Sequence, residues 1–217
     1  MDAVLWDMDG LMIDSEPLWT RAEEELARSL GGTWDEVVKA RIVGTRLDVA
    51  VPTILGYFDV EATSERVRTT AAWLLHRMVE LFSTDELPLL PGVRSLLAAL
   101  AAEQVPMALV SSSYRVLVDA VLAGGVGPFA ITLAGDEVEH GKPAPDPYQL
   151  AAKRLDVDVT RCVVLEDSPA GVASGEAAGC AVVAVPSVPG VRMDAAPRRL
   201  VVPSLEGVTP ADLRALV

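Results

Sequence analysis

Pairs of acidic residues stand at two points of the chain where a short apolar run ends. Asp7 closes the run "AVLW", and Asp9 follows two residues later, before Gly10. Glu166 and Asp167 close a second run, "CVVL". Carboxylates gathered at one place repel each other unless they share a proton or a cation, and a hard, oxygen-rich ligand set suits Mg²⁺. The spacing therefore predicts a magnesium site, with a strand-ending Asx turn as the alternative for the first pair.

Two further segments carry groups that suit a phosphate. Ser111 ends the run "MALV" just before a helical pattern, where its hydroxyl and nearby backbone N–H groups can donate to a phosphoryl oxygen. A plain helix cap is the alternative role for this serine. Lys142 lies in the loop "EHGKPAPDPY", which glycine and prolines stiffen. A lysine held among carboxylates would supply the local positive charge that an anionic substrate needs.

The elements that must position these residues follow from the apolar runs. Their hydrophobicity is continuous rather than alternating, which indicates strands buried on both faces, and helical patterns separate most of them. This alternation predicts an α/β fold with an open parallel sheet, whose ligands bind at the carboxyl ends of the strands. The predicted strands span residues 3–7, 106–113, 130–135, 162–168 and 180–186.

One long segment departs from this alternation. From residue 15 to residue 88 we find several helical patterns and no strand pattern, although a crossover between parallel strands needs only a dozen or so residues. We therefore predict an inserted helical domain at 15–88 and a core domain made of 1–14 and 89–217. The insert begins near the carboxyl end of the first strand, where a lid over a ligand site would stand.

Composition restricts the classes of partner. About half of the 217 residues are apolar, and the formal net charge of −13 argues against nucleic acid, whose binding needs Lys and Arg. Cys162 and Cys180 each begin an apolar run, which predicts core packing rather than a disulfide or a zinc site. Since the sequence has no basic leader and no long apolar segment, we expect a cytoplasmic protein without membrane partners. We also expect a monomer.

Four segments resemble, in order and spacing, the four motifs of the haloacid dehalogenase superfamily: "DMDGLMIDSE", "LVSSS", "GKPAPDPY" and "LEDSPAG". The helical insert is similar to the cap of the β-phosphoglucomutase-like branch. The segments "DGLMIDSEPLWTRAEEELARSLG" and "LLPGVR" look most like those of bacterial 2-deoxyglucose-6-phosphate and hexitol-phosphate phosphatases. The resemblance implies a Rossmann-like core with a small all-helical cap, and an enzyme that hydrolyses the phosphomonoester of a small metabolite.

The resemblance also implies roles for the motif residues. Asp7 would attack phosphorus, and Asp9 would protonate the leaving oxygen and then activate the water that hydrolyses the aspartyl phosphate. Asp9 speaks against dehalogenation, since displacing halide needs no acid for the leaving group. The implied ligands of the phosphoryl oxygens are Ser111, Ser112 and Lys142, and those of Mg²⁺ are Asp7, the Asp9 carbonyl and Asp167, with Glu166 close by.

Two alternatives to a phosphatase stay open. Sugar-phosphate mutases of this branch carry a histidine a few residues after the first motif, and this chain has Trp19 there, as the phosphatases do. The second alternative is a binding or regulatory protein that kept the fold and lost activity. In the insert, the loop "VGTRLD" resembles the substrate-specificity loop of the family, which makes Arg46 and Trp19 candidates for substrate contact, with a surface arginine as the other interpretation of Arg46.

Overall fold

The computed structural model describes residues 1–42, 45–84, 87–187 and 192–217. The chain divides into two compact units. The core unit consists of Met1–Ser15 and Leu87–Val217, and the helical unit is Glu16–Glu86. The predicted junctions, at 14/15 and 88/89, lie close to these bounds.

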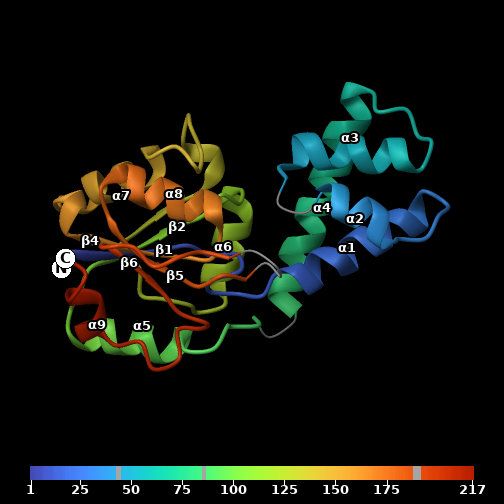
Figure 1. Ribbon diagram of the computed structural model, residues 1–217. Coiled ribbons are helices and arrows are strands. Elements are labelled where there is room, and N and C mark those ends of the chain that lie inside the picture. The colour runs from blue at the N-terminus through green and yellow to red at the C-terminus, as the bar shows by residue number, and fades with distance from the viewer. Residues whose placement is uncertain (43–44, 85–86, 188–191) are drawn as a thin grey trace. The chain divides into compact units, whose positions relative to one another are not determined.

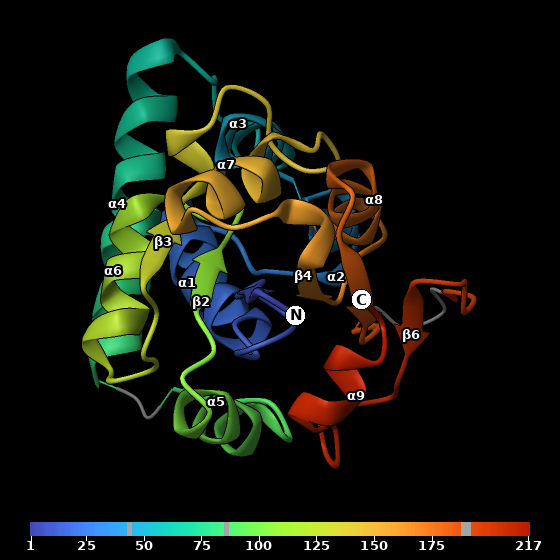
Figure 2. The same ribbon diagram turned by 90° about the vertical axis from the view of Figure 1, so that its left-hand side faces the viewer.

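The core unit contains a six-stranded parallel sheet with the strand order β3-β2-β1-β4-β5-β6 (Figure 1). The predicted α/β fold with an open parallel sheet is thus confirmed. Strand β1 lies between β2 and β4, and Figure 2 shows β3 and β6 at opposite ends of the sheet. The strands are β1 (Ala3–Trp6), β2 (Met107–Val110), β3 (Ile131–Leu133), β4 (Cys162–Glu166), β5 (Ala181–Ala184) and β6 (Arg199–Val201).

The sequence did not predict β6. This edge strand has three residues, "RLV", and all three are only half-buried. The apolar run here, "LVV", has only three residues and is shorter than the runs that marked the other strands. By contrast, every residue of β1, β2, β4 and β5 is buried. Burial on both faces is what the continuous runs predicted for these strands.

Helices cover both faces of the sheet. Figure 1 shows α7 and α8 on one face and α5 and α9 on the other. The α8 helix begins with a serine cap, in which the Ser168 hydroxyl accepts from the backbone N–H of Gly171 at 3.0 Å, and has a proline in its first turn. The helices are α5 (Val93–Ala102), α6 (Arg115–Ala123), α7 (Asp146–Leu155), α8 (Pro169–Ala178) and α9 (Pro210–Arg214), with 3₁₀ turns at Gly135–Glu137 and Val159–Arg161.

Both cysteines belong to the hydrophobic core of the sheet. Cys162 and Cys180 are buried free thiols among the apolar side chains of β1, β2, β4, α7 and α8, as predicted. Burial raises the pKa of Cys162 to about 11 and that of Cys180 to about 12. Neither thiol is therefore suited to act as a nucleophile.

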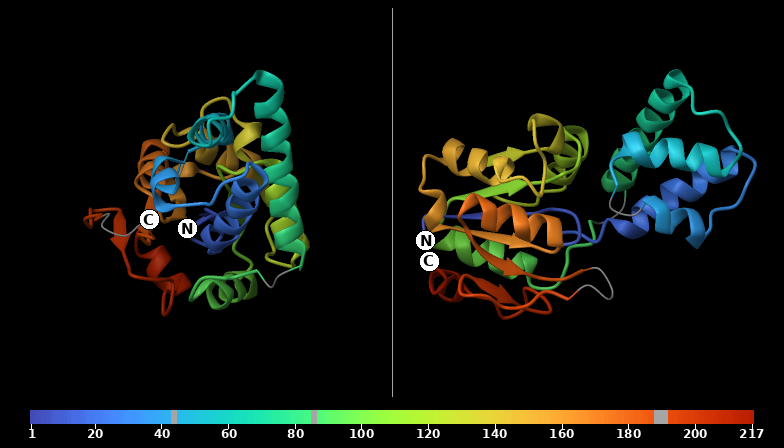
Figure 3. Two further views of the ribbon diagram at one scale, coloured as in Figure 1. Left: turned by 90° about the vertical axis from the view of Figure 1, so that its right-hand side faces the viewer. Right: turned by 45° about the horizontal axis from the view of Figure 1, so that its top comes forward.

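The helical unit follows β1 in the sequence and consists of helices joined by loops, which Figure 3 shows from two further sides. Arg77 donates to both carboxylate oxygens of Glu25, at 2.6 and 2.9 Å, and so ties the last helix of the unit to the first. None of the described helices combines the length and apolarity that a membrane crossing requires. The described part of the helical unit contains α1 (Glu16–Ser29), α2 (Glu36–Ile42), α3 (Leu47–Tyr57) and α4 (Ser64–Thr84).

Candidate active site

The acidic residues meet because of the register between β1 and β4. Trp6 is paired with Leu165, and the backbone N–H of Asp7 donates to the carbonyl of Leu165 at 3.0 Å, so the pairing continues one residue past β1. Asp7 therefore leaves the sheet beside Glu166, the last residue of β4, and Asp167 follows directly. Both predicted acidic pairs lie at the carboxyl edge of the sheet.

A tight turn then folds the chain after Asp7 back onto the site. The backbone N–H groups of Met12 and Ile13 both donate to the carbonyl of Met8, at 2.9 and 3.1 Å. Gly10 has a φ of +83°, and a Cβ at this position would lie 2.2 Å from Asp167 Oδ2. Glycine is required here both for the left-handed backbone and for the close approach to the carboxylate.

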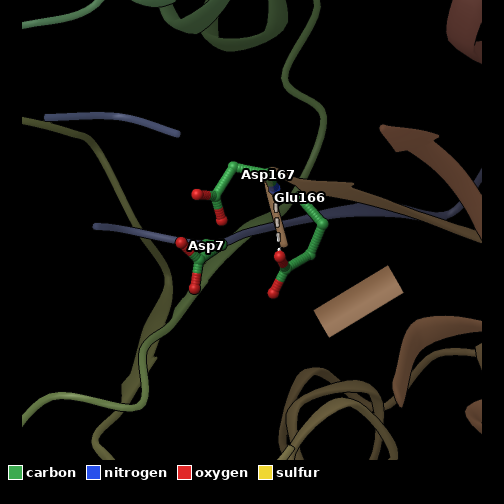
Figure 4. A group of neighbouring side chains, drawn as sticks. All are labelled: Asp7, Glu166 and Asp167. Atoms are coloured by element: carbon green, nitrogen blue, oxygen red, sulfur yellow. Dashed lines mark hydrogen bonds between the residues drawn. The ribbon is translucent and has the colours of Figure 1, made fainter. Parts of the chain in front are cut away.

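Three buried carboxylates form the centre of the site. Asp7, Glu166 and Asp167 each contribute an oxygen, and these oxygens all lie within 4.8 Å of one another. Figure 4 shows the three side chains converging, with a hydrogen bond of 3.0 Å from the Asp167 N–H to Glu166 Oε2. An all-oxygen ligand set of this kind fits Mg²⁺.

Lys142 is the cation that the sequence predicted for the site. Its Nζ lies 2.5 Å from Asp7 Oδ1 and 2.7 Å from Glu166 Oε1, and it also donates to the Val110 carbonyl at 2.9 Å. Burial lowers the pKa of this ammonium, but Asp7 and Glu166 outweigh burial and hold the pKa well above its usual value. Lys142 is therefore charged, and it neutralises part of the acidic cluster.

Lys142 does not offset all of the negative charge of the cluster, and the pKa values of two of the carboxyls are raised. Burial raises the pKa of Asp7 well above its usual value despite Lys142. Burial also raises the pKa of Asp167 to about 7, against the lowering effect of a hydrogen bond from Ser187. One ammonium among three buried carboxylates leaves a deficit of positive charge, which a divalent cation beside Asp7 and Asp167 would fill.

Glu166 differs from the other two carboxylates, because protein donors surround it. Burial raises its pKa, but Lys142 and the hydrogen bonds outweigh burial, so the pKa is lower than usual. A carboxylate offers about four lone-pair positions. Glu166 accepts from five donors, so its hydrogen-bonding capacity is already filled by the protein. Oε1 accepts from Lys142 Nζ and Tyr148 Oη, and Oε2 accepts from Asp167 N, Ser168 N and Ser168 Oγ.

Tyr148 is a site residue that was not predicted, although it stands in the motif "GKPAPDPY". Its side chain is fully buried on α7, its hydroxyl donates to Glu166 Oε1 at 2.9 Å, and Lys142 Nζ lies 5.0 Å from its ring centroid. It thus supports the lysine both directly and through the glutamate. Its position in the first turn of α7, directly after the loop that carries Lys142, is the sequence feature that could have predicted this role.

Asp9 lies among serine hydroxyls from two segments. Ser15 Oγ donates to Oδ1 at 2.6 Å, and Ser113 Oγ donates to Oδ2 at 2.8 Å. The predicted Ser111 donates to the same Oδ2 over a longer 3.4 Å. Ser15 and Ser113 were not predicted, although Ser113 belongs to the motif "LVSSS", whose other two serines, Ser111 and Ser112, were.

The segment after β2 is fixed by the segment after β3. The N–H of buried Ser111 donates to the Leu133 carbonyl at 3.0 Å, and the Ser113 carbonyl accepts from Gly135 at 2.8 Å. A Cβ on Gly135 would lie 2.1 Å from the carbonyl oxygen of Ser112. The predicted phosphate ligand Ser112 is exposed in this rigid turn.

Trp19 and Arg46, the candidates for substrate specificity, belong to the helical unit. Trp19 is half-buried on α1, and Arg46 is exposed before α3, 3.5 Å from Asp48 Oδ1. Their contact with a substrate stays a prediction.

Comparison with known proteins gives consistent matches over most of the chain. The family model for haloacid dehalogenase-like hydrolases matches residues 1–179. Hexitol phosphatase A of Escherichia coli K12 is 36% identical over 183 residues, which are 83% of this chain and 81% of that protein. The bifunctional riboflavin kinase/FMN phosphatase of Arabidopsis thaliana is 34% identical over 191 residues, 86% of this chain, but the chain spans only 48% of that protein.

A solved structure matches almost the whole chain. CbbY from Rhodobacter sphaeroides, in complex with phosphate, superposes with a TM-score of 0.85 and 27% sequence identity. The match covers 98% of this chain and 99% of that one.

Proposed function

The chain belongs to the haloacid dehalogenase-like hydrolases, and we propose that it is a Mg²⁺-dependent phosphatase acting on a sugar phosphate or a similar small metabolite. The family match confirms the resemblance of the four sequence motifs. The observation that carries the proposal is the position of Asp7, whose carboxylate contacts Lys142 and lies within 4.8 Å of the carboxylate oxygens of Asp167 and Glu166.

Asp7 is the proposed nucleophile. A carboxylate can approach a phosphate dianion only when positive charge offsets the repulsion between them. Lys142 supplies one such charge, 2.5 Å from Oδ1. Mg²⁺, held by Asp7, Asp167 and the backbone carbonyl of Asp9, would supply the rest when bound. We assign Glu166 to orienting Lys142, because its oxygens already accept five protein hydrogen bonds.

Asp9 is the proposed proton carrier. In the first step an Asp7 oxygen bonds to phosphorus, the bond from phosphorus to the alcohol oxygen breaks, and Asp9 gives that oxygen a proton. In the second step Asp9 takes a proton from water as the water oxygen attacks phosphorus, which releases inorganic phosphate and restores Asp7. The hydroxyls of Ser15 and Ser113 fix both oxygens of this carboxylate and so support its orientation.

The substrate class rests on relatives and on the chain's own residues. Hexitol phosphatase A is named for a phosphorylated sugar alcohol, and Trp19 stands where mutases of the β-phosphoglucomutase type carry a histidine. We therefore favour hydrolysis over phosphoryl transfer between two positions of one sugar. Arg46, in the loop before α3, is the proposed contact for the distal part of the substrate.

The test is a panel of hexitol, hexose and pentose phosphates and other phosphomonoesters, assayed for inorganic phosphate with Mg²⁺ and again with excess chelator. We expect release from a subset of the sugar phosphates with Mg²⁺ and none with chelator. A parallel reaction would contain β-glucose 1-phosphate with a trace of the 1,6-bisphosphate. Accumulation of glucose 6-phosphate there, with no phosphate released from any compound, would identify a mutase instead.

A further inference from the structure

The carboxylate of Asp167 has a second contact, outside the acidic cluster. Its Oδ2 accepts a hydrogen bond of 2.5 Å from the hydroxyl of Ser187. Ser187 follows β5, and its segment is fixed to the end of β4 because the Val185 N–H donates to the Glu166 carbonyl at 2.7 Å. Ser187 therefore belongs to the segment after β5, and this segment is held beside the acidic cluster by a backbone hydrogen bond.

The backbone of Gly10 lies close to the same oxygen, Asp167 Oδ2. A Cβ at residue 10 would lie 2.2 Å from Asp167 Oδ2 and 3.0 Å from Ser187 Oγ. Oδ2 is thus confined between the backbone of the β1 turn and a hydroxyl donor, and Oδ1 is the oxygen of Asp167 that remains for a ligand.

The donor on Asp167 is neutral, which distinguishes it from the donor on Asp7. Among the residues that the structure describes, Lys142 forms ion pairs with Asp7 and Glu166, and none is formed with Asp167. Ser187 therefore fixes the orientation of Asp167 without cancelling its charge. Lys142 likewise holds one oxygen of Asp7, so within the described part of the chain each of these two aspartates has one oxygen that accepts from another residue's side chain and one that does not.

We propose that Ser187 restricts Asp167 to binding a metal ion through one oxygen and thereby makes the site select Mg²⁺ over Ca²⁺. Mg²⁺ demands six ligands in a compact octahedron, which single oxygens supply, whereas Ca²⁺ takes more ligands and often both oxygens of a carboxylate. A hydrogen bond on the outer oxygen of a metal-binding carboxylate fixes its orientation and contributes to affinity. The inference rests on the proposed function only in requiring that Mg²⁺ binds at this cluster.

Two substitutions of similar shape isolate the hydroxyl. Ser187→Thr keeps the donor and Ser187→Val removes it, while Ser187→Ala provides a second variant without a donor in case the valine disturbs folding. Ser95→Ala is the matched control, because this serine of the core unit donates only to the Gly92 carbonyl of its own helix start, at 2.9 Å. Titration calorimetry on substrate-free, chelator-treated protein would give the dissociation constants for Mg²⁺ and Ca²⁺.

We expect Ser187→Val and Ser187→Ala to weaken Mg²⁺ binding by roughly 10- to 100-fold, the range for outer-shell partners, and to weaken Ca²⁺ binding much less. Ser187→Thr and Ser95→Ala should keep the wild-type ratio of the two constants. The inference would be overturned if Ser187→Val and Ser187→Ala both kept the wild-type ratio of the Mg²⁺ and Ca²⁺ dissociation constants. This holds whether the two affinities are unchanged or both fall by the same factor. If wild-type protein itself bound no Mg²⁺, the metal dependence in the proposed function would fail as well.

Discussion

Lys142 Nζ and Glu166 Oε1 lie 2.7 Å apart, and this ion pair joins the loop after β3 to the end of β4. The glutamate is in turn held by the hydroxyl of Tyr148 and by backbone N–H groups. The lysine is therefore oriented by a carboxylate that is itself rigid. A substitution of a residue that contacts Glu166, and not Asp7 itself, should consequently lower the reaction rate.

Tyr148→Phe tests this chain of contacts. The substitution keeps the buried ring and removes the hydroxyl that donates to Glu166 Oε1. Since the acceptor is charged, we expect the free energy of unfolding to fall by about 1.5 to 3 kcal/mol. We expect kcat to fall by about 10-fold with little change in KM, because Lys142 loses its orientation. Denaturant unfolding and steady-state kinetics measure both effects; wild-type kcat in a destabilised variant would mean that Tyr148 is only structural.

Substitutions of Asp7 and Asp9 separate the attack from the proton transfers. Asp7→Asn should form no covalent adduct and turn over at background, because the nucleophile and a metal ligand are lost together. Asp9→Asn keeps the backbone carbonyl, so it should bind Mg²⁺ normally while kcat falls by about 10² to 10⁴. With p-nitrophenyl phosphate, whose leaving group needs little acid, this variant should be phosphorylated and then stall.

Rapid quenching followed by intact-mass measurement would detect an adduct of about 80 Da in the Asp9→Asn protein, as covalent catalysis requires. The same adduct in Asp7→Asn, or equal turnover in wild type and Asp9→Asn, would contradict the assigned roles.

Gly10→Ala should damage the metal site by placing a methyl group against Asp167 Oδ2. The matched control is Gly125→Ala, since Gly125 has a similar φ of +79° but a Cβ there would meet no atom within 4 Å. Both variants should lose about 1 to 2 kcal/mol of stability from the left-handed backbone. Only Gly10→Ala should also lose Mg²⁺ affinity, by at least about 10-fold. Equal Mg²⁺ affinity in the two variants, measured by calorimetry, would show that Asp167 tolerates the methyl group.

The pKa of Asp167, about 7 in the metal-free protein, predicts a pH dependence of stability. The folded-state pKa is raised above the unfolded value, so the stabilisation is fully present below about pH 4 and is lost as pH rises through about 7. Metal-free protein should therefore melt at a lower temperature at pH 8 than at pH 6. Saturating Mg²⁺ should reverse this loss, because an ion bound at the proposed site would stabilise the ionised carboxylate.

Asp167→Asn provides the control for other titrating groups in this experiment. Its melting temperature in chelator should change less between pH 6 and pH 8 than that of the wild type. Identical pH profiles for the two proteins would mean that Asp167 does not titrate in this range.

The sequence predicted those features that local pattern determines. The apolar run before Asp7 identified strand β1, and the glycine- and proline-rich loop identified Lys142 as a fixed cation. It did not predict the contacts of Asp9 with Ser113 or of Asp167 with Ser187, which join residues 104 and 20 positions apart. Such contacts depend on which strands are neighbours and on the path of each loop, and no periodicity in the sequence carries that information.

The central position of β1 in the sheet also affects folding during translation. Asp7 and Lys142 are 135 residues apart in the chain, so at ribosomal rates of 5–20 residues per second roughly 7 to 27 seconds separate their synthesis. For most of that interval β1 has neither of its partner strands, and its apolar residues are exposed to chaperones or to other nascent chains. The helical unit is continuous in sequence and can fold meanwhile. Catalytic competence is therefore acquired late in translation, when β4 joins β1.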